Sequence, residues 1–183
     1  MSKPLVGAPI GADVDGLVAG VISGSTYPTG LGSPMQLGTV VNGIDGTRYV
    51  LVQAGSASSA MASTKAANAY AIDDSYRARH MTATRGLAGQ GLGFAPQAVI
   101  VAHDYFWARI AGTGFNANRV TASASASKWL KTTATAGVLG TASVTGQVTF
   151  PVVLLTAASA SSSAGAVTRE VYASQLSGFA QVA

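Results

Sequence analysis

The chain has 183 residues, of which only 10% are charged, and its formal net charge is +4. An average soluble domain carries about 25% charged residues, so this protein is unusually poor in charge. It has no cysteine, which excludes disulfides, zinc fingers and thiol catalysis. About half of its residues are Gly, Ala, Ser or Thr, and such small side chains bury little area. We therefore expect its stability to depend on β-ladders and on burial against other subunits.

The basic residues are scattered, with one exception. Arg77, Arg79, His80 and Arg85 gather within nine positions of one another. A solvated strand and turn would explain this stretch, and contact with an acidic partner surface is the alternative. The weak overall charge does not indicate direct contact with nucleic acid.

Membrane and export signals are not expected. No apolar run approaches the roughly 18 residues of a transmembrane helix. Asp13 and Asp15 stand where a signal peptide needs its apolar stretch. The sequence thus predicts a protein that is assembled in the cytosol or carried in a released particle.

Residues 1–36 predict an extended N-terminal arm that lies over a neighbouring subunit. Four prolines with glycines between them disfavour helix here, and a disordered tail is the alternative. One short strand is expected at 17–22. The apolar residues favour an arm with a docking surface, and we assign to it Leu5, Val6, Ile10 and Leu31.

Residues 37–54 predict a β-hairpin. Its turn holds Asn42-Gly43 and Asp45-Gly46, which tolerate the positive φ that tight hairpin turns need. Residues 55–68 predict a loop with at most one helical turn, because Ser and Thr weaken an Ala-rich helix.

The middle of the chain predicts a second hairpin, at 69–84, with its turn at Asp73-Asp74. A glycine-rich loop is expected at 85–97 and a flexible one at 157–166. Pro151 marks an edge strand or a bulge. The remaining apolar or alternating runs predict strands at 98–102, 105–111, 119–127, 128–133, 147–156 and 168–173.

This spacing predicts a mainly β protein, a small β-sandwich or barrel of about eight to ten short strands. It would occupy residues 37–183 and follow the arm at 1–36.

Catalytic chemistry is poorly supported. His103 and Asp104 are adjacent, so they fit a turn better than a site in which a base is oriented by a carboxylate. No G-x-S-x-G elbow occurs, and the glycines at 89–93 lack the Lys-Ser/Thr of a phosphate loop. We therefore expect no enzyme activity, no metal and no cofactor.

The aromatic run of Tyr105, Phe106 and Trp107 has two interpretations. It fits a core strand, and it also fits a strand with one face in the core and the other against a partner. Arg109 is the one basic residue close to it, which is too few for stacking on nucleic acid.

The same region resembles a module of tailed-bacteriophage head proteins. That module reads Pro-Gln-x-Ala-x-x-x-Gly-Asp-Tyr-Gly-Trp-x-x-x-x-Gly, followed downstream by Thr-Thr-x-Thr-Ala-Gly. His103 and Phe106 stand where the first two glycines are usual. The matching residues are Pro96, Gln97, Asp104, Tyr105, Trp107, Gly112, Thr132, Thr133, Thr135, Ala136 and Gly137.

The resemblance implies a capsid decoration (cement) protein on the outer surface of the virion. Its partners would be the major capsid protein and two further copies of itself in a homotrimer, with stabilisation of the shell as its role. The alternatives are a tail, neck or fibre subunit, a major capsid component, or a module that binds host glycans. For the last, Trp129 beside Lys128 and Lys131 is the candidate site.

Overall fold

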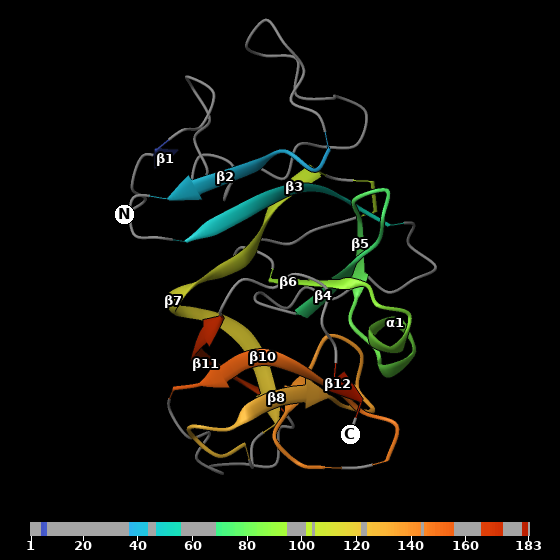
Figure 1. The fold of residues 1–183 in the computed structure, drawn as a ribbon, viewed down its shortest axis with the longest axis vertical. Coiled ribbons are helices and arrows are strands. Elements are labelled where there is room, and N and C mark those ends of the chain that lie inside the picture. Colours follow the sequence, from blue (N-terminus) through green and yellow to red (C-terminus); the bar gives the residue numbers. More distant parts are fainter. Residues whose placement is uncertain are drawn as a thin grey trace, which may run out of the picture.

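The protein is mainly β, as predicted. Strands predominate among the described residues, which form a five-stranded barrel with additional strands (Figure 1). The computed structural model describes residues 5–6, 37–43, 47–55, 69–94, 102–103, 105–121, 124–143, 145–155, 166–173 and 181–182. Predictions for 17–22, 56–68 and 157–165 lie outside this range.

The described residues hold twelve strands and one short helix, α1 (Ala83–Leu87). Three of the strands have only two residues each, which is why the number exceeds the expected eight to ten. In chain order the strands are β1 (Leu5–Val6), β2 (Val40–Gly43), β3 (Arg48–Ala54), β4 (Ala69–Ile72), β5 (Arg77–His80), β6 (Gly91–Phe94), β7 (Tyr105–Thr121), β8 (Trp129–Thr132), β9 (Leu139–Gly140), β10 (Val148–Leu154), β11 (Ala166–Ala173) and β12 (Gln181–Val182).

Strand β7 joins two stacked parts of the molecule. The strand order is β1-β2-β3-β5-β4-β6-β7-β11-β10-β8-β9, and β12 pairs with β10. The first part of β7 pairs with β3 and β6, and its second part pairs with β11. In Figure 1 the strands β2 to β6 lie in the upper part and β8 to β12 in the lower part, with β7 curving through both.

Both predicted hairpins are confirmed. In the first, β2 and β3 are antiparallel, with Val41 opposite Tyr49. Asn42 and Gly43, which were expected in the turn, belong to β2. In the second, β4 and β5 are antiparallel, and the Asp73 carboxylate accepts hydrogen bonds from the backbone N–H groups of Ser75 and Arg77, both at 2.9 Å. Such an Asx turn satisfies local backbone donors, so Asp73 has a structural role.

Two hydrophobic clusters lie on the two faces of β4. Alternation along this strand sends Ala69 and Ala71 into one cluster and Tyr70 into the other. The first cluster joins β4 to the lower part through Leu130, Val148 and other residues. Because β4 is buried on both faces, it lies in the interior of the molecule, between the two clusters.

The predicted glycine-rich loop at 85–97 was wrong at 85–87, which are helical, and at 91–94, which form a strand, whereas 88–89 form a turn. Helix α1 extends into this range, capped by Thr82, whose side chain accepts a hydrogen bond from the N–H of Arg85 at 3.3 Å. Strand β6 follows and pairs with β4. A Cβ at Gly93 would lie 2.8 Å from Cδ1 of Ile72, so close packing of strands explains this glycine and not a loop.

The predicted strand at 119–127 was also wrong in its second half. β7 ends at Thr121, and residues 126–127 form a turn in which Ser127 has a φ of 57°. Small side chains on both faces provide too little packing area to hold a strand there. Of the strand expected at 98–102, Ala102 alone lies within the described residues, and it belongs to a turn.

The remaining strand predictions agree with the structure. β8 and β11 lie within or across the expected ranges. The register between β8 and β10 shifts between Thr149 and Val153, the interval that contains Pro151. Since β10 has neighbours on both sides, Pro151 marks a bulge and not an edge strand.

Candidate interaction surfaces

Three positions of the phage-like pattern adopt left-handed backbone conformations. His103 has a φ of 69°, Gly112 of 140° and Gly137 of 74°. The pattern has glycine at all three, and glycine adopts such conformations without steric cost. His103 therefore occupies a turn, as expected, and keeps the backbone shape that the usual glycine would give.

Gly112 is required by contact as well as by conformation. A Cβ at this position would lie 2.8 Å from Oγ1 of Thr47 and 3.1 Å from its Cα. The chain can therefore pass close to the residue that precedes β3 only because position 112 has no side chain.

The threonines of the pattern bond to the backbone. Thr132 is buried, and its Oγ1 accepts a hydrogen bond from the N–H of Val148 at 3.0 Å. The hydroxyl of Thr133 donates to the carbonyl oxygens of Val138, at 2.9 Å, and of Thr135, at 3.1 Å. These bonds satisfy polar groups at the end of β8, which explains this part of the pattern structurally.

The aromatic run lies in the interior of the single chain. Phe106 is fully buried, Trp107 is 2% exposed and Tyr105 is 9% exposed. Phe106 packs against Tyr70, with ring centroids 5.6 Å apart. Both faces of this run are covered within the chain, with Phe106 on one face and Tyr105 and Trp107 on the other. This agrees with the interpretation of a core strand, and neither face of the run is exposed for a partner.

Arg109 is half-buried, and its guanidinium lies over the ring of Tyr49, 5.6 Å from the centroid. These residues are register partners on β7 and β3. A cation–π contact of this kind stabilises the strand pair, so Arg109 has a structural role in the described part of the molecule.

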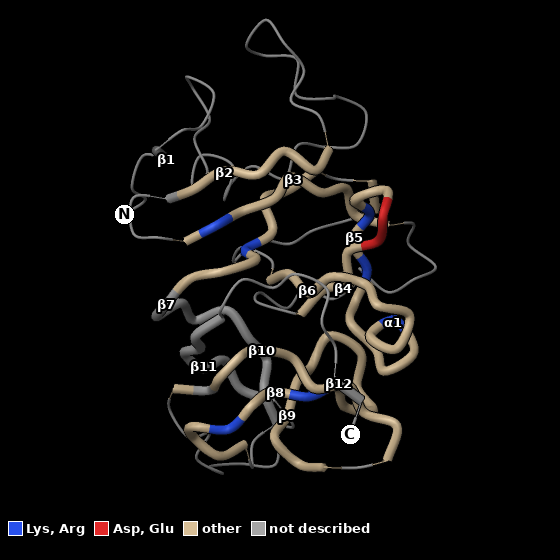
Figure 2. Tube along the Cα trace, viewed as in Figure 1, with Lys and Arg blue, Asp and Glu red and all other residues tan. Residues whose placement is uncertain are grey.

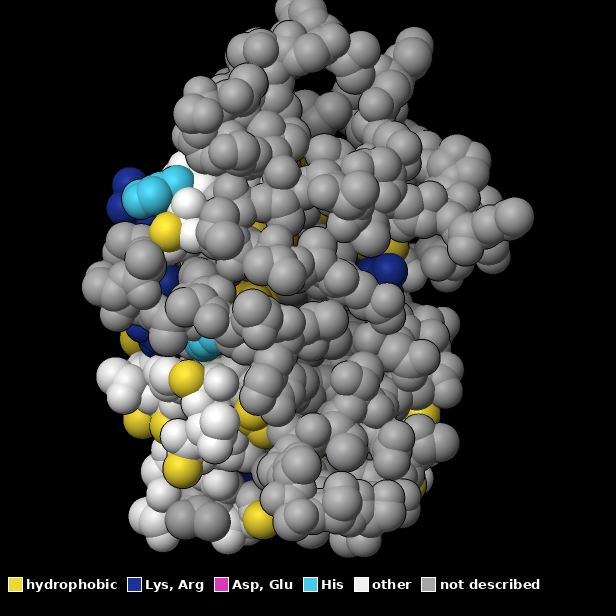
Figure 3. Space-filling view, turned by 180° about the vertical axis from the view of Figure 1, so that it is seen from behind, with side chains coloured by type: hydrophobic (Ala, Val, Ile, Leu, Met, Phe, Trp, Pro, Cys, Tyr) yellow, Lys and Arg dark blue, Asp and Glu magenta, His cyan; other side chains and the backbone are white. Residues whose placement is uncertain are grey.

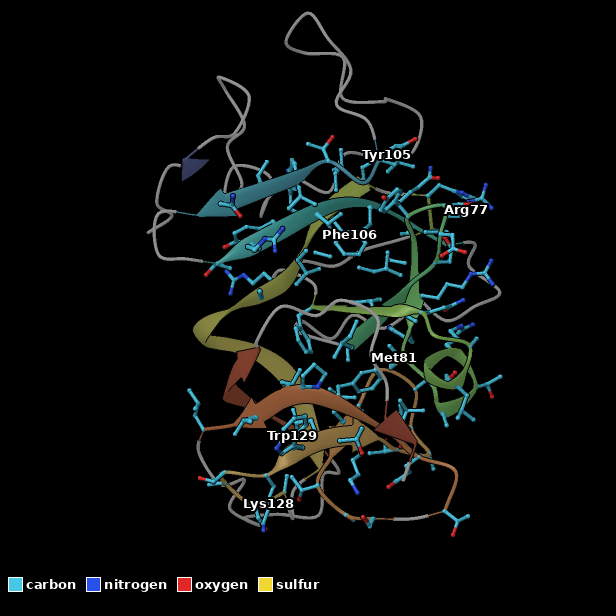
Figure 4. The ribbon with its side chains drawn as sticks, in the orientation of Figure 1. Arg77, Met81, Tyr105, Phe106, Lys128 and Trp129 are labelled. Atoms are coloured by element: carbon cyan, nitrogen blue, oxygen red, sulfur yellow. The ribbon has the colours of Figure 1, made fainter. Side chains whose placement is uncertain are left out.

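Trp129 belongs to an exposed apolar surface on the outer face of β8 and β10. It is 54% exposed and lies directly opposite Val153, which is half-buried. On β8 the alternation places Leu130 and Thr132 inside and Trp129 and Lys131 outside. We call this surface, formed by Trp129, Pro151 and Val153, the Trp129 surface (Figure 4).

Two lysines border the Trp129 surface. Lys128 is exposed, and the Nζ of Lys131 donates to the hydroxyl of Ser143. In Figure 4 both labelled residues of this region, Lys128 and Trp129, lie in the lower part of the molecule. The sequence identified the Trp and the lysines, but only the register shows that Val153 extends the apolar area.

The basic stretch forms a second surface, on β5 and α1. Arg77 is exposed, and Arg79 and Arg85 are partly exposed. His80 is buried, and its ring centroid lies 5.2 Å from that of Tyr70. We call Arg77, Arg79 and Arg85 the basic strip. Figure 2 shows basic positions on β5 and α1 in the right-hand part of the tube.

The arm residues are described only in part. Leu5 and Val6 form β1, which pairs antiparallel with β2 of the same chain, Leu5 opposite Gly43 and Val6 opposite Asn42. Ile10 and Leu31 lie outside the described residues. The pairing shows that the backbone of this segment extends the upper sheet.

Within the described residues, no three His, Asp or Glu side chains gather as metal ligands would. No described helix is long and apolar enough to span a bilayer. His103 is exposed at its turn and His80 is buried against an aromatic ring, so the two imidazoles occupy unrelated environments.

Comparison of the chain with protein-family models, with curated proteins and with solved structures gave no match.

Proposed function

We propose that this protein is a capsid decoration protein of a tailed bacteriophage. It binds the outer surface of the assembled head, contacts the major capsid protein and stabilises neighbouring capsomers as a homotrimer. The observation that carries the proposal is the phage-like pattern, whose positions at His103, Gly112 and Gly137 have the positive φ that its glycines would supply.

The exposed Trp129 surface supports this proposal. Trp, Pro and Val side chains on one sheet face remove apolar area from water when a partner covers them, and Trp is enriched at the centres of interfaces. Each contact can be weak, because a trimer that binds several capsomers at once gains affinity through multivalency.

The N-terminal arm is the second element of the proposal. Residues 1–36 reach a neighbouring subunit, and β-strand addition of the kind seen between β1 and β2 within the chain is the way in which they bind it. Main-chain hydrogen bonds give affinity in such contacts without large side chains, which suits a chain so rich in small residues.

The direct test adds the purified protein to expanded, undecorated phage heads. Saturable binding and a higher temperature of head disruption are expected, because a ligand that binds only the intact shell stabilises it. Heads that neither bind the protein nor gain heat resistance would contradict the proposal.

Two variants locate the binding elements. Trp129→Ala is expected to weaken head binding. Leu87→Ala is the control, because Leu87 is also an exposed apolar residue, with 52% of its surface exposed, and this variant is expected to leave head binding unchanged. Deletion of residues 1–36 is expected to weaken binding while the remaining β structure keeps its circular dichroism. Undiminished affinity of the deletion variant would remove the arm from the proposal.

A glycan-binding module is the second candidate, and the 54% exposure of Trp129 next to Lys128 is the observation that favours it. An exposed indole offers a flat face for a sugar ring. A glycan array signal that is lost in Trp129→Ala, together with an absence of head binding, would favour this candidate over decoration.

A further inference from the structure

The basic strip presents guanidinium groups on one side of β5. Along this strand Ala78 and His80 are buried, so Arg77 and Arg79, two positions apart, face outward. Arg85 on α1 adds a third charge: burial first, and then the nearby charge of Arg79, lower the pKa of Arg85. Like charges have thus been gathered where they repel one another.

The strip is held in place by its surroundings. Gln53 is the register partner of Arg77, and its side-chain nitrogen donates to the carbonyl oxygen of His103 at 3.3 Å. A Cβ at Gly55 would lie 2.9 Å from Cγ of Arg79, so the arginine stem passes directly over this glycine. Such packing orders the strip before any partner arrives, which lowers the entropy cost of binding.

Arg85 is also anchored. Its Nη1 donates to the carbonyl oxygen of His80 at 2.7 Å. One edge of the Arg85 guanidinium is therefore used in a contact within the chain, and this contact fixes α1 beside the end of β5.

The charge of the strip is not neutralised among the described residues. Oδ1 of Asp73, in the turn before β5, accepts from two backbone N–H groups. The Nε of Arg79 is buried and has no hydrogen-bond partner in the described part of the chain. Three arginines that pair with no acidic side chain among the described residues can bind the acidic groups of another molecule.

We infer that the basic strip is a binding surface for the carboxylate groups of an acidic protein partner. Arginine binds carboxylates through paired N–H groups, and such charge-assisted bonds are stronger than neutral ones. Figure 3 shows dark blue and cyan side chains together at one margin of the face in view. Arg77 is exposed, and Arg79 and Arg85 are partly exposed.

The neighbouring residues favour a protein over a nucleic acid. Asp73 and Asp74 lie at the turn before β5, and Asp74 is exposed. A continuous phosphate backbone along the strip would meet this negative charge, whereas the separate carboxylates of a folded protein can lie on the arginines alone. Tyr76, 41% exposed, packs its ring over Gly38, which leaves less of it for stacking on bases. Tyr and Arg side by side are typical of protein interfaces. This inference holds whether or not the protein decorates a capsid.

The test uses the full-length protein and a fluorescent oligo-glutamate peptide, with binding measured by anisotropy at low ionic strength. The variant Arg77→Gln/Arg79→Gln is expected to lose about tenfold or more in affinity. Its matched control, Lys65→Gln/Arg169→Gln, removes the same charge from two positions outside the strip and is expected to stay within about twofold of the wild type.

Several results would overturn the inference. The first is that the wild-type protein does not bind the peptide, and the second is that both double variants lose the same affinity for it. The third is that the wild type binds duplex DNA more tightly than the peptide and that the arginine variant no longer binds the DNA. If the double variant does not fold, the single variant Arg77→Gln, which changes an exposed residue, is used in its place and is also expected to bind the peptide more weakly than the wild type. Arg77→Lys/Arg79→Lys is expected to retain part of the affinity, because it keeps the charge but not the paired N–H geometry.

Discussion

The backbone N–H of Gly137 donates to the carbonyl oxygen of Met81 at 2.9 Å. The carbonyl of Gly137 in turn accepts from the N–H of Ala69 at 3.0 Å, and Met81 donates to Ala69 at 2.9 Å. The turn after β8 is thereby bonded to the start of β4 and to the end of β5. Since β8 belongs to the lower part and β4 and β5 to the upper part, this turn joins the two parts of the molecule.

Gly137→Ala is expected to destabilise the protein by about 2 kcal/mol or more, because a left-handed conformation costs an L-residue about 1–2 kcal/mol. Relaxing the φ of 74° would also displace the bonds to Met81 and Ala69. The free energy of unfolding in urea measures the effect. Gly89→Ala is the control: it has the same φ but nothing within 4 Å of its Cβ, so it is expected to cost only the conformational part. Equal losses would show that the bonds at position 137 add nothing.

Thr132→Val is expected to cost about 1–3 kcal/mol, because it leaves the buried N–H of Val148 without its acceptor. Thr132→Ser keeps the hydroxyl and loses one methyl group, about 0.8 kcal/mol. Hydrogen exchange at the Val148 amide separates the two effects. It is expected to speed up in the Val variant and not in the Ser variant, and unchanged exchange in both would contradict this hydrogen bond.

His103→Gly is expected to stabilise the protein by about 0.5–1 kcal/mol. Glycine removes the left-handed strain at a φ of 69°, and its larger entropy in the unfolded state offsets part of that gain. His103→Val is expected to destabilise, because β-branched residues tolerate positive φ poorly. Thermal unfolding of the three proteins gives the order Gly, His, Val; the reverse order would rule out strain at this turn.

The two tryptophans are expected to respond very differently to truncation. Trp107→Ala should cost about 3–5 kcal/mol, because the side chain is 2% exposed and its removal leaves a cavity. Trp129→Ala should change the free energy of unfolding by about 0.5 kcal/mol or less, since the side chain is 54% exposed. Denaturant titration of both variants measures the difference. A large loss in Trp129→Ala would mean that this residue supports the fold.

The two hairpins could be predicted because their signals are local. Asp-Gly and Asp-Asp sequences between β-branched or aromatic runs favour a turn by backbone sterics alone, whereas Asn42-Gly43, which carries the same local signal, belongs to β2. The bulge in β10 follows in the same way from Pro151, which has no N–H to donate. The all-β class rests on many such short-range signals, and it is confirmed.

The glycine-rich stretch before residue 95 shows where local signals fail. Glycine at 91 and 93 has the composition of a loop, but in the structure it allows β6 to pack closely against β4 and β7. That close approach involves residues far away in sequence. Nothing in the local composition distinguishes a glycine that bends the chain from one that makes room for a neighbour.

Whether a residue belongs to an interaction surface also depends on contacts between residues that are far apart in sequence. By itself the sequence determined the fold class, the hairpins and the poverty of charge, because these follow from residue types and their spacing. The tertiary structure alone decided that Tyr105, Phe106 and Trp107 are covered while Trp129 is exposed, and that His80 of the basic stretch is buried while Arg77 is exposed. Alternation along a strand tells which side chains share a face, but which face meets water depends on the strands that pack against it.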